Sequence, residues 1–159
     1  MRLFANIISI LFHPLLMVTY GIALALTCTY LAVYPANFRW LLVGAAFFST
    51  SLVPGLFILM MAKSGAVGDL ELSSRKERVI PYLIIVSSIM ICLFFMYRMM
   101  MPFWFLAQLA GAVVALIVAL GINFYWKISA HAIGIGGLLG GIMGIAHVQM
   151  MNPYWAFIA

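Results

Sequence analysis

Two short groups of polar residues contain the side chains of this sequence that are best suited to chemistry. They are basic, hydroxyl and imidazole side chains: Arg75, Lys76, Arg78, Lys127, Ser129 and His131. Guanidinium groups bind phosphate oxygens in pairs, and a lysine adds a point charge. A serine hydroxyl offers a hydrogen bond, and an imidazole gives or takes a proton near neutral pH. These residue types predict a site that handles phosphate.

The rest of the chain has the composition of an integral membrane protein. Hydrophobic residues make up 67% and charged residues 7%, and the mean hydropathy is +1.22. A soluble domain needs roughly a quarter of its residues charged, so that class is excluded. The solid apolar runs favour helices over a barrel of alternating strands. The net charge of +5 is too scattered for nucleic-acid binding and suits contact with membrane lipids.

The apolar segments predict five transmembrane helices, since about 20 helical residues cross a bilayer core. Turn residues and interfacial aromatics place the spans at about 13–34, 39–63, 81–98, 102–123 and 132–151. Pro54 and Gly55 predict a kink inside the second span. The fold class is therefore an all-α, polytopic transmembrane bundle.

Counting crossings puts both polar groups on one face of the membrane. An even number of spans separates His13, the stretch from Gly65 to Pro81 and the stretch from Lys127 to His131. The two polar groups meet if the third and fifth helices pack together. His147 falls on the other face, about 24 Å from His131 along one helix.

The fifth predicted span is rich in glycine from Gly134 onward. Gly136 and Gly140, Gly137 and Gly141, and Gly140 and Gly144 are each four residues apart. Small residues at this spacing let helix backbones approach closely in lipid. The pattern predicts a packing face, and association of copies of the chain through this helix is one use of it.

The order and spacing of the polar groups resemble two motifs of a known family. Arg75, Arg78 and Pro81 loosely match a motif in which a basic residue is followed by Arg-Pro, with two residues between Arg78 and Pro81. Ile128-Ser129-Ala130-His131 is similar to a second motif, Pro-Ser-Gly-His, with Ser and His kept. A pair of transmembrane helices separates the motifs. Over roughly residues 63 to 145 the chain thus resembles the type 2 phosphatidic acid phosphatases.

The resemblance implies a membrane enzyme that hydrolyses a lipid phosphate or diphosphate without a metal or cofactor. Arg75 and Arg78 would hold the phosphate, together with Lys127 and Ser129. His131 would protonate the leaving lipid alkoxide. Asp69 would orient the arginines. The implied location is the bacterial inner membrane.

A third motif of the family is missing from this sequence. It contains an Arg, the nucleophilic His and an orienting Asp, and it should come two spans after His131. Residues 153–159 read as the start of a sixth helix. We therefore expect residues 1–159 to be a single transmembrane domain, truncated at its C-terminus, with the nucleophile beyond Ala159 unless His13 substitutes.

Three other readings stay open. A non-catalytic lipid-binding or assembly protein would use the arginines to hold headgroups. A small transporter would suit the kinked second span, although the spans lack a central acidic residue. A lipid-synthesising transferase would need more carboxylates than Asp69 and Glu71. Orientation is also open, because the count of basic residues favours a cytoplasmic polar face and the resemblance favours the opposite one.

Overall fold

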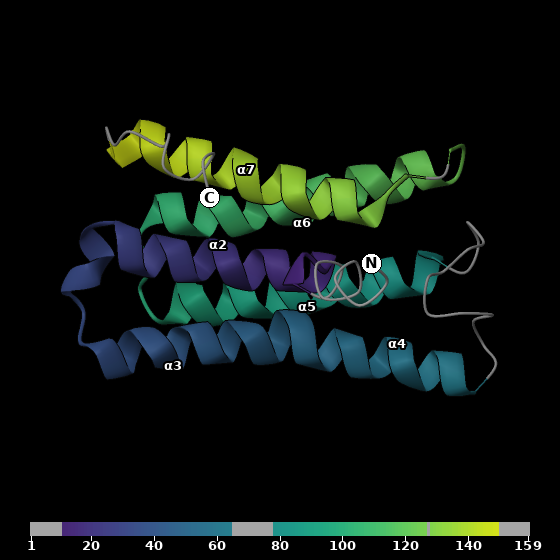
Figure 1. The fold of residues 1–159 in the computed structure, drawn as a ribbon, viewed down its shortest axis with the longest axis horizontal. Coiled ribbons are helices and arrows are strands. Elements are labelled where there is room, and N and C mark those ends of the chain that lie inside the picture. Colours follow the sequence, from purple (N-terminus) through teal and green to yellow (C-terminus); the bar gives the residue numbers. More distant parts are fainter. Residues whose placement is uncertain (1–10, 65–77, 127, 150–159) are drawn as a thin grey trace, which may run out of the picture.

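The computed structural model describes residues 11–64, 78–126 and 128–149, and every regular element in these ranges is a helix (Figure 1). The α-helices are α2 (Pro14–Cys28), α3 (Ala36–Phe47), α4 (Val53–Lys63), α5 (Val79–Arg98), α6 (Phe103–Asn123) and α7 (Ala130–Gln149). A 3₁₀ helix, η1 (Tyr30–Val33), follows α2, and a π-helical segment, η2 (Phe48–Leu52), joins α3 to α4.

Four helical segments are long and apolar enough to cross a membrane. They are Ala36–Lys63, Val79–Arg98, Phe103–Asn123 and Ala130–Gln149. α2 has 15 residues, or about 22 Å of helix, and η1 adds about 8 Å. Together these two elements approach the roughly 30 Å of a hydrocarbon core. The prediction of an all-α transmembrane bundle is confirmed, and α2 is shorter than each of the four long helical segments.

The helix starts differ slightly from the predicted span boundaries. α5 begins at Val79, so Pro81 lies in its first turn, where a missing N–H costs no hydrogen bond. α7 begins at Ala130. His131 therefore belongs to the first turn of α7 instead of preceding the helix.

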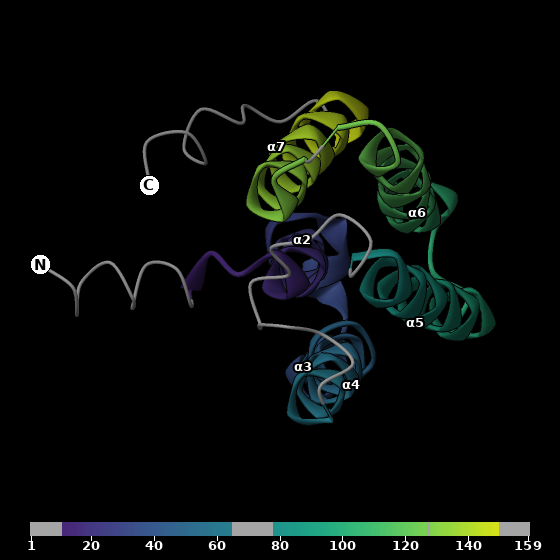
Figure 2. The ribbon, with the colours of Figure 1, turned by 90° about the vertical axis from the view of Figure 1, so that its right-hand side faces the viewer.

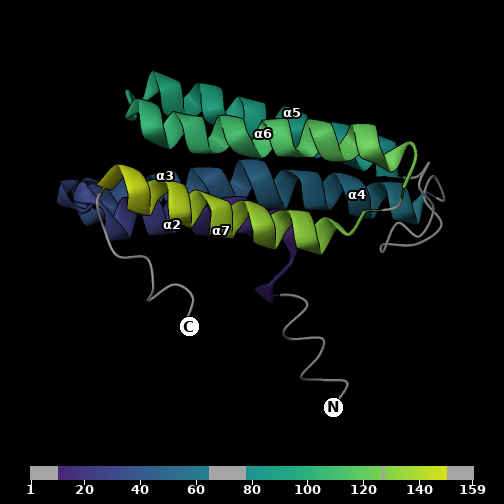
Figure 3. The ribbon, with the colours of Figure 1, turned by 90° about the horizontal axis from the view of Figure 1, so that it is seen from above.

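α2 occupies the middle of the bundle (Figure 2). It packs against α7, α3 and η2, and less extensively against α6. α6 packs between α5 and α7, and α4 packs on α5. Seen from above, the helices run nearly along one common axis (Figure 3). The starts of α2, α5 and α7 lie toward the same end, which we call the polar end (Figure 1).

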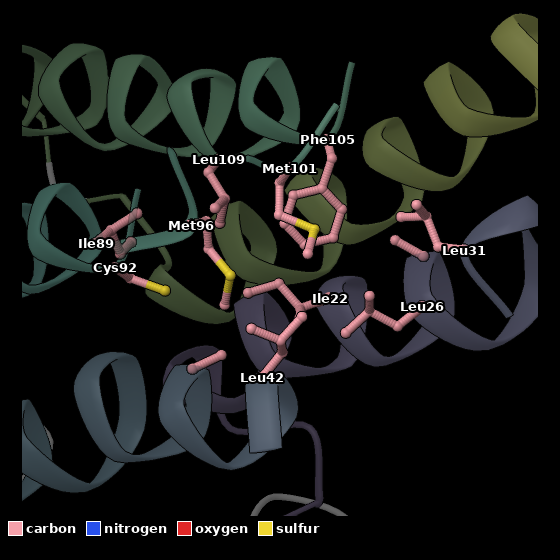
Figure 4. Close-up of a cluster of buried hydrophobic side chains, with 12 residues drawn as sticks. Ile22, Leu26, Leu31, Leu42, Ile89, Cys92, Met96, Met101, Phe105 and Leu109 are labelled. Atoms are coloured by element: carbon pink, nitrogen blue, oxygen red, sulfur yellow. The ribbon is translucent and has the colours of Figure 1, made fainter. Parts of the chain in front are cut away.

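The main hydrophobic cluster lies toward the opposite end, near η1 (Figure 4). Leu26, Leu42 and Met96 come from three different helices and are each completely buried. Lipid is as apolar as these side chains, so close packing, not the exclusion of water, must hold the helices together.

The second span stays helical through Pro54, as predicted. Pro54 cannot donate to the carbonyl four residues earlier, and the helix adapts by widening to π geometry just before it. The hydroxyls of Thr50 and Ser51 in this segment lie 3.4 and 3.1 Å from the hydroxyl of Thr19 on α2. The distortion therefore also provides a polar contact between two spans.

The glycines of α7 serve two different surfaces. Gly134 and Gly141 face other helices of the chain, whereas Gly136, Gly137, Gly140 and Gly144 face open space. Of the glycines in the predicted four-residue pairs, only Gly141 packs against another helix of the chain, and Gly134 packs although it belongs to none of these pairs. Association between copies through the open glycines stays a prediction.

Candidate functional site at the polar end of the bundle

Ser129 sits immediately before α7 and caps its first turn. Its hydroxyl accepts the N–H of Ala132 at 3.3 Å, and its carbonyl accepts the N–H of Ile133 at 3.2 Å. Serine is a favoured residue at this position because its short side chain satisfies a free backbone donor. The cap fixes where the helix starts and therefore where His131 stands.

Arg78 immediately precedes α5 and is almost fully buried, with 8% of its surface exposed. One of its guanidinium nitrogens, Nη1, donates to the backbone carbonyl of Ile128, the residue before Ser129. This bond crosses 50 positions of sequence. It anchors the arginine beside the beginning of α7.

His13 caps the start of α2 in the same way that Ser129 caps α7. Its Nδ1 accepts the N–H of Leu15 at 3.4 Å, and Pro14 occupies the first helical position. Proline suits this position because its fixed backbone angle is already helical. The sequence predicted this helix start.

The rings of His13 and His131 lie next to one another in an edge-on, T-shaped arrangement. Their centroids are 6.0 Å apart and their planes are inclined by 72°. The neighbouring helix surfaces are in close contact, since a Cβ added to Gly134 would lie 3.1 Å from the Cα of Pro14. Backbone packing between α2 and α7 therefore sets the distance between the two imidazoles.

The pKa of His13 is lowered from its ordinary value. Partial burial of the ring is the larger cause, because it disfavours the charged imidazolium. The charge that His131 carries when protonated is the second cause. The two rings are thus close enough for a charge on His131 to act on His13.

The predicted site residues are brought together only in part. Arg78, Ser129 and His131 meet at the polar end, as the crossings required. We expected the third and fifth predicted spans, α5 and α7, to pack together. Instead α7 packs mainly on α2 and α6. Among the described residues, the long side chain of Arg78 reaches from the start of α5 to the residue before Ser129. Asp69, Arg75 and Lys127 lie outside the described residues.

Two features of this end did not emerge from the sequence. Tyr82 is one helical turn after Arg78 and is 5% exposed, and its hydroxyl has no hydrogen-bond partner in the described part of the chain. The contact between His13 and His131 is the second. The four-residue spacing of Arg78 and Tyr82 was a visible signal, but nothing local linked His13 to His131.

Within residues 11–64, 78–126 and 128–149, no three His, Cys, Asp or Glu side chains gather in a way that could hold a metal ion. A metal-free reaction nevertheless stays a prediction.

No family model, curated protein or solved structure matches this chain. The resemblance to the type 2 phosphatidic acid phosphatases therefore rests on the motifs alone.

Proposed function

We propose that this membrane protein is a hydrolase that releases phosphate from a lipid phosphate or lipid diphosphate. The observation that carries the proposal is the bond from buried Arg78 to the carbonyl of Ile128. It holds a guanidinium next to Ser129 and His131. The bacterial inner membrane is the location that we propose.

The chemistry follows from the groups at the polar end. A phosphoryl group in transfer carries spread negative charge, and fixed positive groups stabilise it. Arg78 supplies a full charge, and the first turn of α7 adds backbone N–H groups and the positive end of its dipole. Because the Ser129 hydroxyl accepts the N–H of Ala132, its own proton remains available for a phosphate oxygen.

His131 is the proton donor in this proposal. It stands exposed in the first turn of α7, where a phosphate held by Arg78 and Ser129 would meet it. As the bond between phosphorus and the lipid oxygen breaks, the imidazolium gives its proton to the leaving alkoxide. The phosphoryl acceptor is the histidine that the resemblance implies in a third motif, and in a second step water attacks the phosphohistidine, its P–N bond breaks and phosphate is released, with neutral His131 taking the proton of the water.

The test is phosphate release by the full-length protein from phosphatidic acid in mixed micelles, with EDTA present. We expect Arg78→Ala and His131→Ala each to lower kcat/KM by at least about 100-fold, since each removes charge or proton transfer from the transition state. His147→Ala is the matched control and should keep full activity. Unchanged activity in either of the first two variants would overturn the assignment.

A second candidate is a protein that holds lipid headgroups without turning them over. The bonds of Arg78 and Ser129 to backbone atoms favour it, because they are structural contacts that need no reaction. This alternative predicts that His131→Ala binds anionic vesicles as well as the unchanged protein does. It also predicts no phosphate release from the unchanged protein.

A further inference from the structure

His13 lies beside the proposed site, although it belongs to a different span from Arg78, Ser129 and His131. Its ring centroid is 6.0 Å from that of His131. Each imidazole is carried by the first residues of a helix or the residue just before it. The close approach of Pro14 to Gly134 fixes these two helix starts against one another. The pair is therefore held by backbone contact and not by flexible chains.

The capping bond of His13 decides which ring nitrogen carries its proton. Nδ1 accepts the N–H of Leu15, and a nitrogen that accepts a hydrogen bond has no proton of its own. Neutral His13 therefore keeps its proton on Nε2. The unprotonated nitrogen faces the backbone of α2, which favours a donor role over the role of substitute nucleophile.

The charged surroundings of the pair are known for the described elements. Lys63 ends α4 and Arg78 precedes α5 at this end of the bundle, and both are cations. The acidic residues Asp69, Glu71 and Glu77 lie in the stretch outside the described residues. Two adjacent imidazoles are poorly placed to be protonated together unless an anion joins them.

We propose that His13 is a further binding residue of the same oxyanion site, donating from Nε2 to an oxygen of the phosphate group that Arg78 and His131 hold. This inference rests on the proposed function. The lowered pKa of His13 agrees with it, because a bound anion would relieve the repulsion that His131 exerts. Binding a dianion then takes up a proton from solvent, and affinity falls as pH rises through the imidazole range.

Histidine-ring NMR of the full chain in detergent micelles can test this directly. Residues 1–159 contain three histidines, His13, His131 and His147, and a variant that lacks each of them assigns its ring signals. Sulfate is a suitable probe because its charge is constant between about pH 5.5 and pH 8. At pH 6 we expect sulfate to shift the signals of His13 and His131 together. His147, about 24 Å from His131, should not respond.

His13→Asn is the informative variant. Asparagine is a good helix cap, so α2 keeps its start while the imidazole is lost. We expect sulfate affinity, followed at the ring of His131, to fall about tenfold at pH 6, as the loss of one charge-assisted hydrogen bond predicts. His147→Asn should leave the affinity unchanged, and Arg78→Ala should abolish the shifts of both rings.

A second measurement needs no ligand. In His131→Asn the pKa of His13 should rise, because a neighbouring positive charge is removed; His147→Asn should leave that pKa unchanged. An unchanged pKa of His13 in His131→Asn would contradict the pairing of the rings and overturn the inference.

The outcomes separate the inference from the function on which it rests. If sulfate shifts His131 but not His13, the oxyanion site stands and the role of His13 is overturned. If sulfate shifts neither ring, the inference fails together with the oxyanion site. If sulfate shifts both rings of the unchanged protein but binds His13→Asn with unchanged affinity, His13 is also removed from the site.

Discussion

Arg78 and Tyr82 share one face at the start of α5, and both side chains are buried. Arg78 has a backbone acceptor in Ile128, but the hydroxyl of Tyr82 is buried without a hydrogen-bond partner among the described residues. Such a group loses its bonds to water and gains nothing in return, which costs on the order of 1–3 kcal/mol. The buried hydroxyl of Tyr82 should therefore lower the free energy of unfolding, and removing it tests this.

Tyr82→Phe removes this hydroxyl and keeps the ring. We expect it to raise the free energy of unfolding by about 1 kcal/mol, measured by thermal or denaturant unfolding in detergent. Tyr30→Phe is the control. It should lower the free energy of unfolding, because the hydroxyl of Tyr30 accepts a hydrogen bond from Trp104 Nε1 at 2.8 Å. A destabilised Tyr82→Phe would mean that its hydroxyl is bonded in the folded protein.

At the scale of elements, the contact between α2 and α7 matters most for the site. Gly134 makes it possible, because any Cβ there would lie 3.0 Å from the Cγ of Met17 and 3.1 Å from the Cα of Pro14. A side-chain atom can move aside, but a backbone atom at the start of a helix cannot do so without shifting the helix. The separation of His13 and His131 depends on this one missing methyl group.

Gly134→Ala should therefore destabilise the fold by about 1–3 kcal/mol, less any gain in helix propensity. It should also return the pKa of His13 toward its ordinary value, since α7 is pushed away from α2. Gly140→Ala is the matched control: nothing lies near its added methyl group, so its stability should be unchanged or slightly higher. Unfolding in detergent and ring titration of His13 measure both effects. Equal behaviour of the two variants would count against the close contact.

At the scale of the whole molecule, the starts of α2, α5 and α7 gather at the polar end and η1 lies at the other (Figure 1). This separation requires α2 to cross the membrane, although it has only 15 residues. The other four spans are long enough by themselves. The sidedness of the site therefore depends on α2, which is shorter than those four segments.

Cysteine labelling in intact cells tests this arrangement. Cys28 and Cys92 are first replaced by alanine, and single cysteines are placed at Ser64 and Trp126 near the polar end, or at Val33 and Met100 near the other. A membrane-impermeant maleimide should label the first pair from one side and the second pair from the other. Labelling of Ser64→Cys and Val33→Cys from the same side would show that α2 does not cross. The side that labels the first pair also gives the orientation.

Several parts of the fold followed from the sequence because they depend on local chemistry. Apolar length requires helices in lipid, since every backbone donor needs an internal partner. Pro14 and Pro102 each mark a helix start, and Pro54 predicted a distortion that does not interrupt the helix. Counting membrane crossings also placed Arg78 and His131 on the same face of the membrane, because each transmembrane helix moves the chain to the opposite side.

The sequence by itself thus determined the helical bundle, the approximate spans and the shared face of the two polar groups. Only the tertiary structure decided that α7 packs on α2, that Arg78 reaches Ile128, and that His13 stands beside His131. The physical reason is that lipid does not favour one apolar helix face over another, so helix neighbours depend on shape. Here the deciding contact is the close approach of Gly134 to Pro14. These residues are 120 positions apart, so no local sequence pattern predicts that they meet.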